Sequence, residues 1–158
     1  SPSSLWFTKQ FPAQRWAEMA AALPAHYQIF LLGGKTDEAL CSQVVAMANH
    51  PGITPLAGSL SFLESAALMK LCRMNFTNDS APLHFASAVD APVTAVFCST
   101  VPSFGFGPLS SDSAVIEVEE ELKCRPCGLH GKKECPEKHF RCAIDIDIRR
   151  LLHRAKGV

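Results

Sequence analysis

The feature that most constrains the fold is the regular alternation of short apolar runs with longer stretches of helical pattern. In residues 37–48, Leu40 and Val44 recur at the spacing of one helix face. Ser61, followed three residues later by Glu64, has the pattern of a capping box at the start of another helix. We expect strands at residues 5–7, 27–32, 53–56, 74–77, 93–97 and 114–118, and helices at residues 13–23, 37–48, 62–71, 82–89 and 144–155.

Strands that alternate with helices are typical of βαβ units. The sequence therefore predicts an α/β fold, a Rossmann-like parallel sheet with helices on both faces. At 158 residues, the chain is long enough for a single core, so we expect one domain over residues 1–158.

Composition narrows the class of protein. Hydrophobic residues make up 47% of the chain, and 15 basic residues balance 15 acidic ones. This balance argues against a charged disordered chain and against a nucleic-acid-binding protein. No apolar run approaches the ~20 residues of a membrane span, and the first residues lack the pattern of a signal peptide. The chain also lacks an initiator Met. We therefore expect a piece of a longer, cytoplasmic protein.

Several loops that follow predicted strands carry polar or glycine-rich sequences. The carboxyl ends of parallel strands meet at one edge of the sheet, where ligands usually bind. Thr8 and Lys9 offer a hydroxyl and an ammonium group to a phosphate, although a loop lysine is also often a solvated surface charge. Gly33 and Gly34 would let backbone amides approach a ligand, but such a pair also forms simple turns. Residues 99–107 add hydroxyls and glycine amides. Together these loops favour an anionic, sugar-bearing ligand.

The most informative loop, NDSAP at residues 78–82, ends a predicted strand and begins a helix. Free N–H groups and the helix dipole at such a junction favour an anion such as the pyrophosphate of a nucleotide. Asp79 would repel phosphate, so we expect it to accept hydrogen bonds from the hydroxyls of a sugar. His84 lies about one turn into the helix, near the same rim. In the alternative interpretation, Asp79 or Ser80 caps the helix and His84 packs in the core.

Seven cysteines are many for this length. Three of them, Cys41, Cys72 and Cys98, lie among apolar or small residues and are expected to pack in the core. The other four crowd into the last third of the chain and predict a tetrahedral zinc site, with His130 and His139 as further candidate ligands. Disulfides formed on oxidation and buried free thiols are the alternatives. The four cysteines of this cluster are Cys124, Cys127, Cys135 and Cys142.

Basic residues surround the cysteine cluster and make its surface locally positive. Such a surface would attract phosphate or anionic lipid, although a solvated loop explains it equally well. The basic residues are Lys123, Arg125, Lys132, Lys133, Lys138 and Arg141.

Taken together, these stretches resemble glycosyltransferase family 9, the ADP-heptose:lipopolysaccharide heptosyltransferases. FTNDSAPLHFASAVDAPVTAVF is similar to the donor-site signature of that family, and the resemblance covers nearly the whole chain. The other similar stretches are WFTKQFPAQRWAEM, FLLGGKTDEALC, PLAGSLSFLESAALMKLC and CRPCGLHGKKECPEKHFRCAIDI.

The resemblance implies one half of a GT-B glycosyltransferase: the C-terminal domain, which binds an ADP-sugar, with the N-terminal acceptor domain absent. Such an enzyme transfers heptose to a lipid-linked lipopolysaccharide inner core, with inversion and without a catalytic metal. It is cytoplasmic, with at most peripheral contact with the inner membrane, and binds no nucleic acid. We expect no cofactor beyond a possible structural zinc. A stand-alone nucleotide- or zinc-binding module is the alternative.

The resemblance also assigns roles to residues. It implies that Thr8 and Lys9 contact phosphate, that Asp79 holds sugar hydroxyls and that His84 lies beside them. The acidic residue near the ribose would be Asp37 or Glu38. Ser80 and Ala81 would donate backbone N–H groups to the pyrophosphate, with Ala81 standing where many members have Gly. No catalytic residue is expected in this domain, because the general base of the family is usually assigned to the N-terminal half.

Overall fold

The computed structural model describes residues 1–157 and has five short strands, all parallel to their neighbours. They form two sheets, one of order β1-β2 and one of order β3-β4-β5. The parallel α/β architecture predicted from the sequence is confirmed, but the described strands do not form one continuous sheet. The strands are β1 (Ile29–Leu31), β2 (Ile53–Pro55), β3 (Asn75–Asn78), β4 (Val93–Val96) and β5 (Ser113–Ile116).

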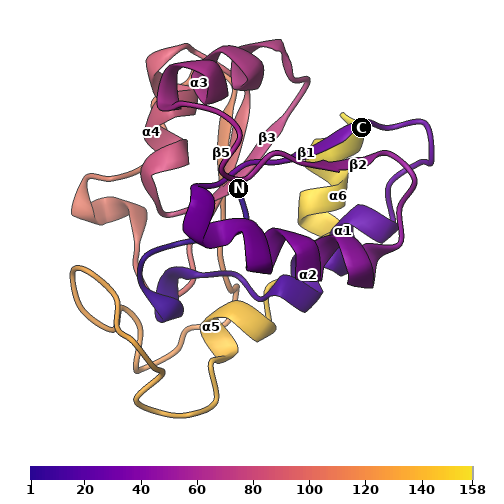
Figure 1. Ribbon diagram of the computed structural model, residues 1–158. Helices are drawn as coiled ribbons and strands as arrows, with labels where there is room; N and C mark the ends of the chain where they lie inside the picture. Colours follow the sequence, from indigo (N-terminus) through magenta and orange to yellow (C-terminus); the bar gives the residue numbers. More distant parts are fainter. Residues whose placement is uncertain (158) are drawn as a thin grey trace.

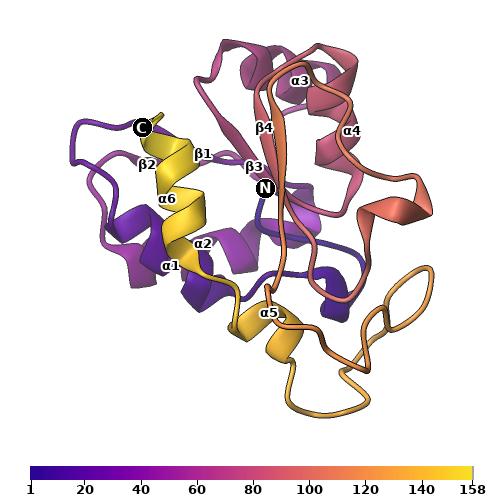
Figure 2. The same cartoon turned by 180° about the vertical axis from the view of Figure 1, so that it is seen from behind.

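Helices connect the strands and cover both faces of the larger sheet. Figures 1 and 2 show α3 and α4 on one side of β3-β4-β5 and α1, α2 and α6 on the other. The α-helices are α1 (Ala13–Ala21), α2 (Glu38–Ala48), α3 (Phe62–Leu71), α4 (Ala81–Ala88), α5 (Arg141–Ile144) and α6 (Ile148–Lys156). Three short 3-10 helices are η1 (Phe7–Lys9), η2 (Lys35–Asp37) and η3 (Pro102–Phe104). None of the helices in residues 1–157 is long and apolar enough to cross a bilayer.

The central strand β4 separates two hydrophobic cores. Successive side chains of a strand point to opposite faces, and β4 and the residue after it follow this rule. Val93, Ala95 and Phe97 pack in the core with Leu83 of α4. Val96 belongs to the other core, which gathers residues of α1, α2 and α6. Burial on both faces explains why β4 is apolar almost throughout.

The capping box predicted at Ser61 is confirmed. The Ser61 hydroxyl accepts from the Glu64 N–H at 3.3 Å, and the Glu64 carboxylate accepts from the Ser61 N–H at 2.8 Å. These reciprocal bonds satisfy two of the donors left free at a helix start.

One prediction at the start of the chain is wrong. The strand expected at residues 5–7 is absent: Leu5 is 91% exposed, and the chain turns instead into η1. The helix expected at residues 144–155 is present as α6 but begins four residues later, and α5 is a separate short helix before it. The later start arises because the Asp147 side chain caps α6 by accepting from the Arg149 N–H at 2.9 Å.

Candidate functional site

Three of the polar loops predicted from the sequence meet around the carboxylate of Asp79. This residue directly follows β3 and is only 4% exposed. Lys9 at the end of η1 lies with its Nζ 2.6 Å from Asp79 Oδ2. The Thr100 hydroxyl, just beyond β4, donates to the same oxygen at 2.7 Å. A buried carboxylate is thus paired with one cation and one hydroxyl, and its Oδ1 forms no hydrogen bond within residues 1–157.

Thr8 forms hydrogen bonds that connect the loops around Asp79 to the cysteine-rich segment. Its side-chain oxygen accepts from the Ser99 hydroxyl at 3.0 Å and from the Lys132 N–H at 2.7 Å. Its backbone N–H donates to the Lys132 carbonyl at 3.1 Å, and its carbonyl accepts from the Ser99 N–H at 3.2 Å. Thr8 is 1% exposed, so its present role is to hold the loop after β4 and the cysteine-rich segment against η1.

The start of α4 borders Asp79. The Ala81 N–H forms no hydrogen bond within residues 1–157, Pro82 has no N–H, and the Leu83 N–H donates to the Ser80 carbonyl at 3.0 Å. Among the described residues, no side chain caps this helix: Ser80, the N-cap residue, instead directs its hydroxyl toward the Asn78 carbonyl. Ala81 and His84 are both exposed. The alternative interpretation, in which Asp79 or Ser80 caps α4 and His84 packs in the core, is therefore wrong. An uncapped helix start with exposed residues is suited to binding an anion.

The glycine turn after β1 is closed by a hydrogen bond within the turn itself, unlike the loops around Asp79. The Asp37 carboxylate accepts from the Gly34 N–H at 2.8 Å, which closes η2 on itself. Gly33 is required there because a Cβ would lie 2.8 Å from the Asp37 side chain. Glu38 is exposed at the start of α2. No hydrogen bond or ion pair in residues 1–157 joins this turn to Asp79, so the structure leaves the ribose role predicted for Asp37 or Glu38 untested.

Arg125 supports the loop that holds Asp79, and it was not singled out as a site residue. Its guanidinium donates to the carbonyls of Cys98 and Thr100, each at 2.7 Å, and to the Glu117 carboxylate at 2.5 Å. These bonds join the cysteine-rich segment to the loop after β4. In the sequence, Arg125 is one of six basic residues around the cysteines, and nothing local distinguishes it.

Gly131 brings the same segment against Lys9. Its φ is +79°, and a Cβ there would lie 2.8 Å from Lys9 Cγ. Only a glycine permits both the backbone conformation and the close approach to the lysine stem. The Cys-rich segment thus lies beside the site rather than apart from it.

All four clustered cysteines are free thiols. Cys124 Sγ lies 3.8 Å from His139 Nε2, and the Cys127 thiol donates to the Cys124 carbonyl at 3.2 Å. Burial, with the nearby Cys127 and Cys135 thiols, raises the pKa of Cys142 to about 12 and keeps it protonated. Within residues 1–157, no three His, Cys, Asp or Glu side chains are arranged to hold a metal ion. The predicted zinc site, including His130, therefore gains no support from the geometry.

A family model, curated relatives and solved structures all match this chain to the same family of proteins. The profile of "Glycosyltransferase family 9 (heptosyltransferase)" matches residues 1–140. "Lipopolysaccharide heptosyltransferase 2" of Salmonella typhimurium is 31% identical over 150 residues, which cover 91% of this chain and 41% of the relative.

Two solved structures share the fold. The E. coli "ADP-heptose lps heptosyltransferase II" superimposes with a TM-score of 0.78 at 24% identity. A family 9 glycosyl transferase from Veillonella parvula gives 0.79 at 23% identity. In each case the match covers 99% of this chain and 44% of the other. The chain therefore spans less than half the length of these relatives.

Proposed function

Because the chain belongs to glycosyltransferase family 9, we propose that it is the donor-binding domain of a heptosyltransferase, which holds an ADP-sugar while heptose is transferred to the lipopolysaccharide inner core. The observation that carries this proposal is the buried Asp79 carboxylate, held by Lys9 and Thr100 beside the uncapped start of α4. The E. coli structure similar to this chain has ADP-heptose in its name, and we propose the same donor for this chain on that basis.

The geometry suggests how one loop accommodates both a sugar and a diphosphate. Lys9 and Thr100 both contact Asp79 Oδ2, which leaves Oδ1 as an acceptor for sugar hydroxyls. The Lys9 ammonium has three N–H donors, and its ion pair with Asp79 uses one. The remaining donors are available to a diphosphate without breaking the ion pair. Lys9 would then bridge the carboxylate and the phosphate and offset their repulsion.

Charge stabilisation at this site would favour departure of the nucleoside diphosphate. Negative charge develops on the leaving group as the bond to the sugar breaks, and the Lys9 ammonium and the N–H of Ala81 are positioned beside the proposed phosphate site. Fixed donors of this kind lower the barrier because they need no reorganisation. We propose an inverting transfer without a catalytic metal, whose general base lies outside this domain.

The remaining partners follow from the same proposal. The acceptor is a lipid-linked core saccharide bound by a second domain, and the enzyme works on the cytoplasmic side, with at most peripheral contact with the membrane. Since no metal takes part, we expect EDTA to leave donor binding unchanged. Metal analysis of protein purified under reducing conditions tests the separate prediction of zinc at the cysteines.

Calorimetric titration of the longer protein with ADP, UDP, GDP and ADP-heptose tests the proposal. We expect selective binding of ADP that becomes tighter when heptose is attached. Preference for another nucleotide would change the proposed donor, and a transfer assay on the same protein separates an enzyme from a nucleotide-binding module. Equal affinity for all nucleotides, with no gain from the sugar, would contradict the donor role.

A further inference from the structure

The loop that follows β4 is buried but has no regular secondary structure. Cys98 and Ser99 are 0% exposed and Thr100 is 1% exposed, and the three residues form neither a strand nor a helix. Buried backbone carbonyls need hydrogen-bond donors. Because the loop lies outside the sheet, these donors have to come from another part of the chain.

The C-R-P-C segment, which contains Arg125 and Cys127, supplies the donors. The Arg125 guanidinium donates from Nε to the Cys98 carbonyl and from Nη2 to the Thr100 carbonyl, each at 2.7 Å. The Cys127 N–H donates to the Ser99 carbonyl at 2.9 Å. Three successive carbonyls of the loop after β4 therefore accept from one segment that is distant in the sequence.

Arg125 is itself held in place. Its side chain is 11% exposed, and its Nη2 also donates to the Glu117 carboxylate at 2.5 Å. A guanidinium is planar and its N–H groups point in fixed directions, so its bonds to two carbonyls set the path of the backbone between them. A lysine ammonium can replace one of these contacts, but it cannot make all of them in the same geometry.

The loop held by Arg125 carries the hydroxyl that binds the central carboxylate of the site. The Thr100 hydroxyl donates to Asp79 Oδ2 at 2.7 Å, and Lys9 Nζ lies 2.6 Å from the same oxygen. Displacement of the Thr100 backbone would break this hydrogen bond and release one side of the carboxylate. Asp79 Oδ1, the proposed acceptor for sugar hydroxyls, would then lose its fixed direction.

We propose that Arg125 is a positioning residue for the donor sugar. It holds the loop after β4 so that the Thr100 hydroxyl stays on Asp79 Oδ2 and Oδ1 stays available to a sugar hydroxyl. The inference rests on the proposed function for the identity of the ligand, whereas the hold of Arg125 on the loop can be tested without any ligand.

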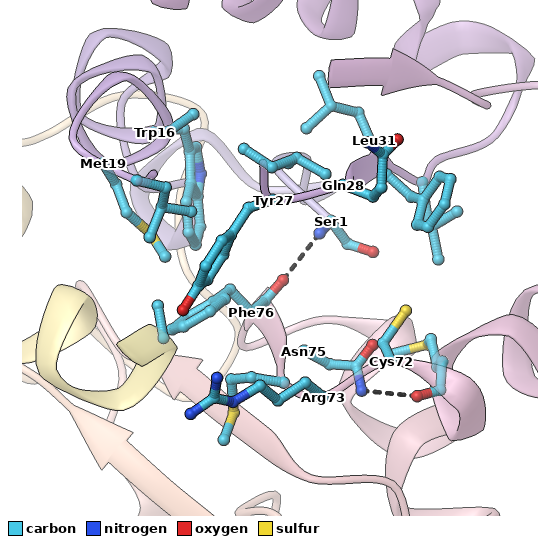
Figure 3. A pocket seen from close by; sticks show the side chains of 18 of the residues that line it. Ser1, Trp16, Met19, Tyr27, Gln28, Leu31, Cys72, Arg73, Asn75 and Phe76 are labelled. Carbon is cyan, nitrogen blue, oxygen red and sulfur yellow. Dashed lines mark hydrogen bonds between the residues drawn. The ribbon is translucent and has the colours of Figure 1, made fainter. Parts of the chain in front are cut away.

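Hydrogen exchange of the longer protein without ligand is the first test. In Arg125→Lys, we expect the amides of Ser99 and Cys127 to exchange about tenfold faster, because the loop loses hydrogen bonds. Asn75 is the internal reference: its N–H donates to the Pro92 carbonyl at 2.9 Å, and Figure 3 shows it on the wall of a cavity between β1 and β3. Unchanged exchange at the two loop amides, or the same acceleration at Asn75, would overturn the proposal.

Calorimetry with ADP and ADP-heptose is the second test. Arg125→Lys should lower the affinity for ADP-heptose about tenfold and that for ADP by less than about twofold. Glu117→Gln keeps the arginine and removes its carboxylate partner, so we expect a smaller loss of ADP-heptose affinity, about threefold. The matched control is Arg154→Lys, which should change neither affinity, because Arg154 joins the Thr94 hydroxyl to the Asp112 carboxylate instead. Equal losses for both ligands in the Arg125 variant would show a general structural role and contradict the proposal.

A double-mutant cycle tests whether Arg125 acts through Thr100. Thr100→Val removes the hydroxyl that binds Asp79, so Arg125→Lys should cause no further loss of ADP-heptose affinity in that background. A further tenfold loss, or about that, would show that Arg125 acts by another route and would refute the proposal. If heptose gave the unchanged protein no gain over ADP, the donor function would fail, and the ligand-free exchange experiment would still decide whether Arg125 holds the loop.

Discussion

Asp37 and Asp79 both lie where a strand gives way to a helix, yet the chain uses the two carboxylates differently. Asp37 accepts from the N–H of Gly34, three residues earlier, and closes its own turn. Asp79 is paired with Lys9 and Thr100, which lie 70 residues before it and 21 residues after it. The first carboxylate serves local structure, whereas the second joins three loops.

The difference also appears in the helices that follow. Asp37 lies in the 3-10 turn that leads into α2, and its own carboxylate satisfies a backbone donor there. Asp79 leaves the start of α4 without a side-chain cap in the described part of the chain. Carboxylates near helix starts usually cap them, so the uncapped start of α4 supports the proposal that a phosphate binds beside Asp79.

The largest effect is expected from Asp79→Asn in the longer protein. The substitution removes the charge that pairs with Lys9 and weakens the proposed bonds to sugar hydroxyls, so affinity for ADP-heptose should fall about 10- to 100-fold. Affinity for ADP should fall less, because ADP lacks the sugar. Calorimetry with both ligands measures the difference, and Asp147→Asn, a change at a carboxylate whose partner is Arg149, is the control that should change neither. Equal losses for both ligands would contradict the assignment.

Lys9→Ala should weaken ADP and ADP-heptose alike, each by about tenfold, because its proposed partner is the diphosphate that they share. The matched control is Lys35→Ala, which removes an exposed lysine from the turn of Asp37. Calorimetric titration of both variants with ADP and with ADP-heptose measures these affinities. Unchanged affinity in the Lys9 variant would remove this residue from the phosphate site.

Much of the fold was predictable because it depends on local patterns. The five strands, the capping box at Ser61 and the polar loops after the strands follow from hydrophobic spacing and turn residues. The meeting of Asp79 and Thr100 was also predictable, because both follow parallel strands whose carboxyl ends meet at one edge. Thr8 and Lys9 reach the same edge through η1, without the strand that was expected before them.

The contacts that complete the site depend on tertiary structure and left no local signal. Arg125 binds the Thr100 carbonyl across 25 residues, and the Lys132 backbone binds Thr8 across 124. The incorrect strand at residues 5–7 has a similar cause: an apolar triplet predicts a strand, but the chain turns there to bring Lys9 to Asp79. The sequence also does not predict the ion pair between Lys9 and Asp79, because it assigns Lys9 to a phosphate and Asp79 to sugar hydroxyls.

A smaller effect, on stability, is expected from Thr8→Val, which tests the long-range hydrogen bonds of Thr8 directly. Valine matches the shape of threonine but accepts no hydrogen bond, so the buried donors of Ser99 and Lys132 lose their partner. The cost is about 1–2 kcal/mol, or a fall in Tm of roughly 2–8 °C. Thr8→Ser keeps the oxygen and should retain most of the stability in a thermal melt. An equal loss in the serine variant would attribute the effect to packing of the methyl group.

The smallest effect is expected at Asp147, a second carboxylate with only local partners. Hydrogen bonds from Arg149 lower the pKa of Asp147 to about 2. A depressed pKa stabilises the fold above the unfolded value of about 3.9, and the contribution is lost as the pH falls toward 2. Asp147→Asn keeps a capping oxygen and removes the charge, so Tm should fall by about a degree at pH 7, since an exposed pair contributes little. Thermal melts from pH 7 to pH 2 should show this difference disappear. A difference that persists at pH 2 would show that the charge of Asp147 is not what matters, and the contrast with Asp79 would then rest on geometry alone.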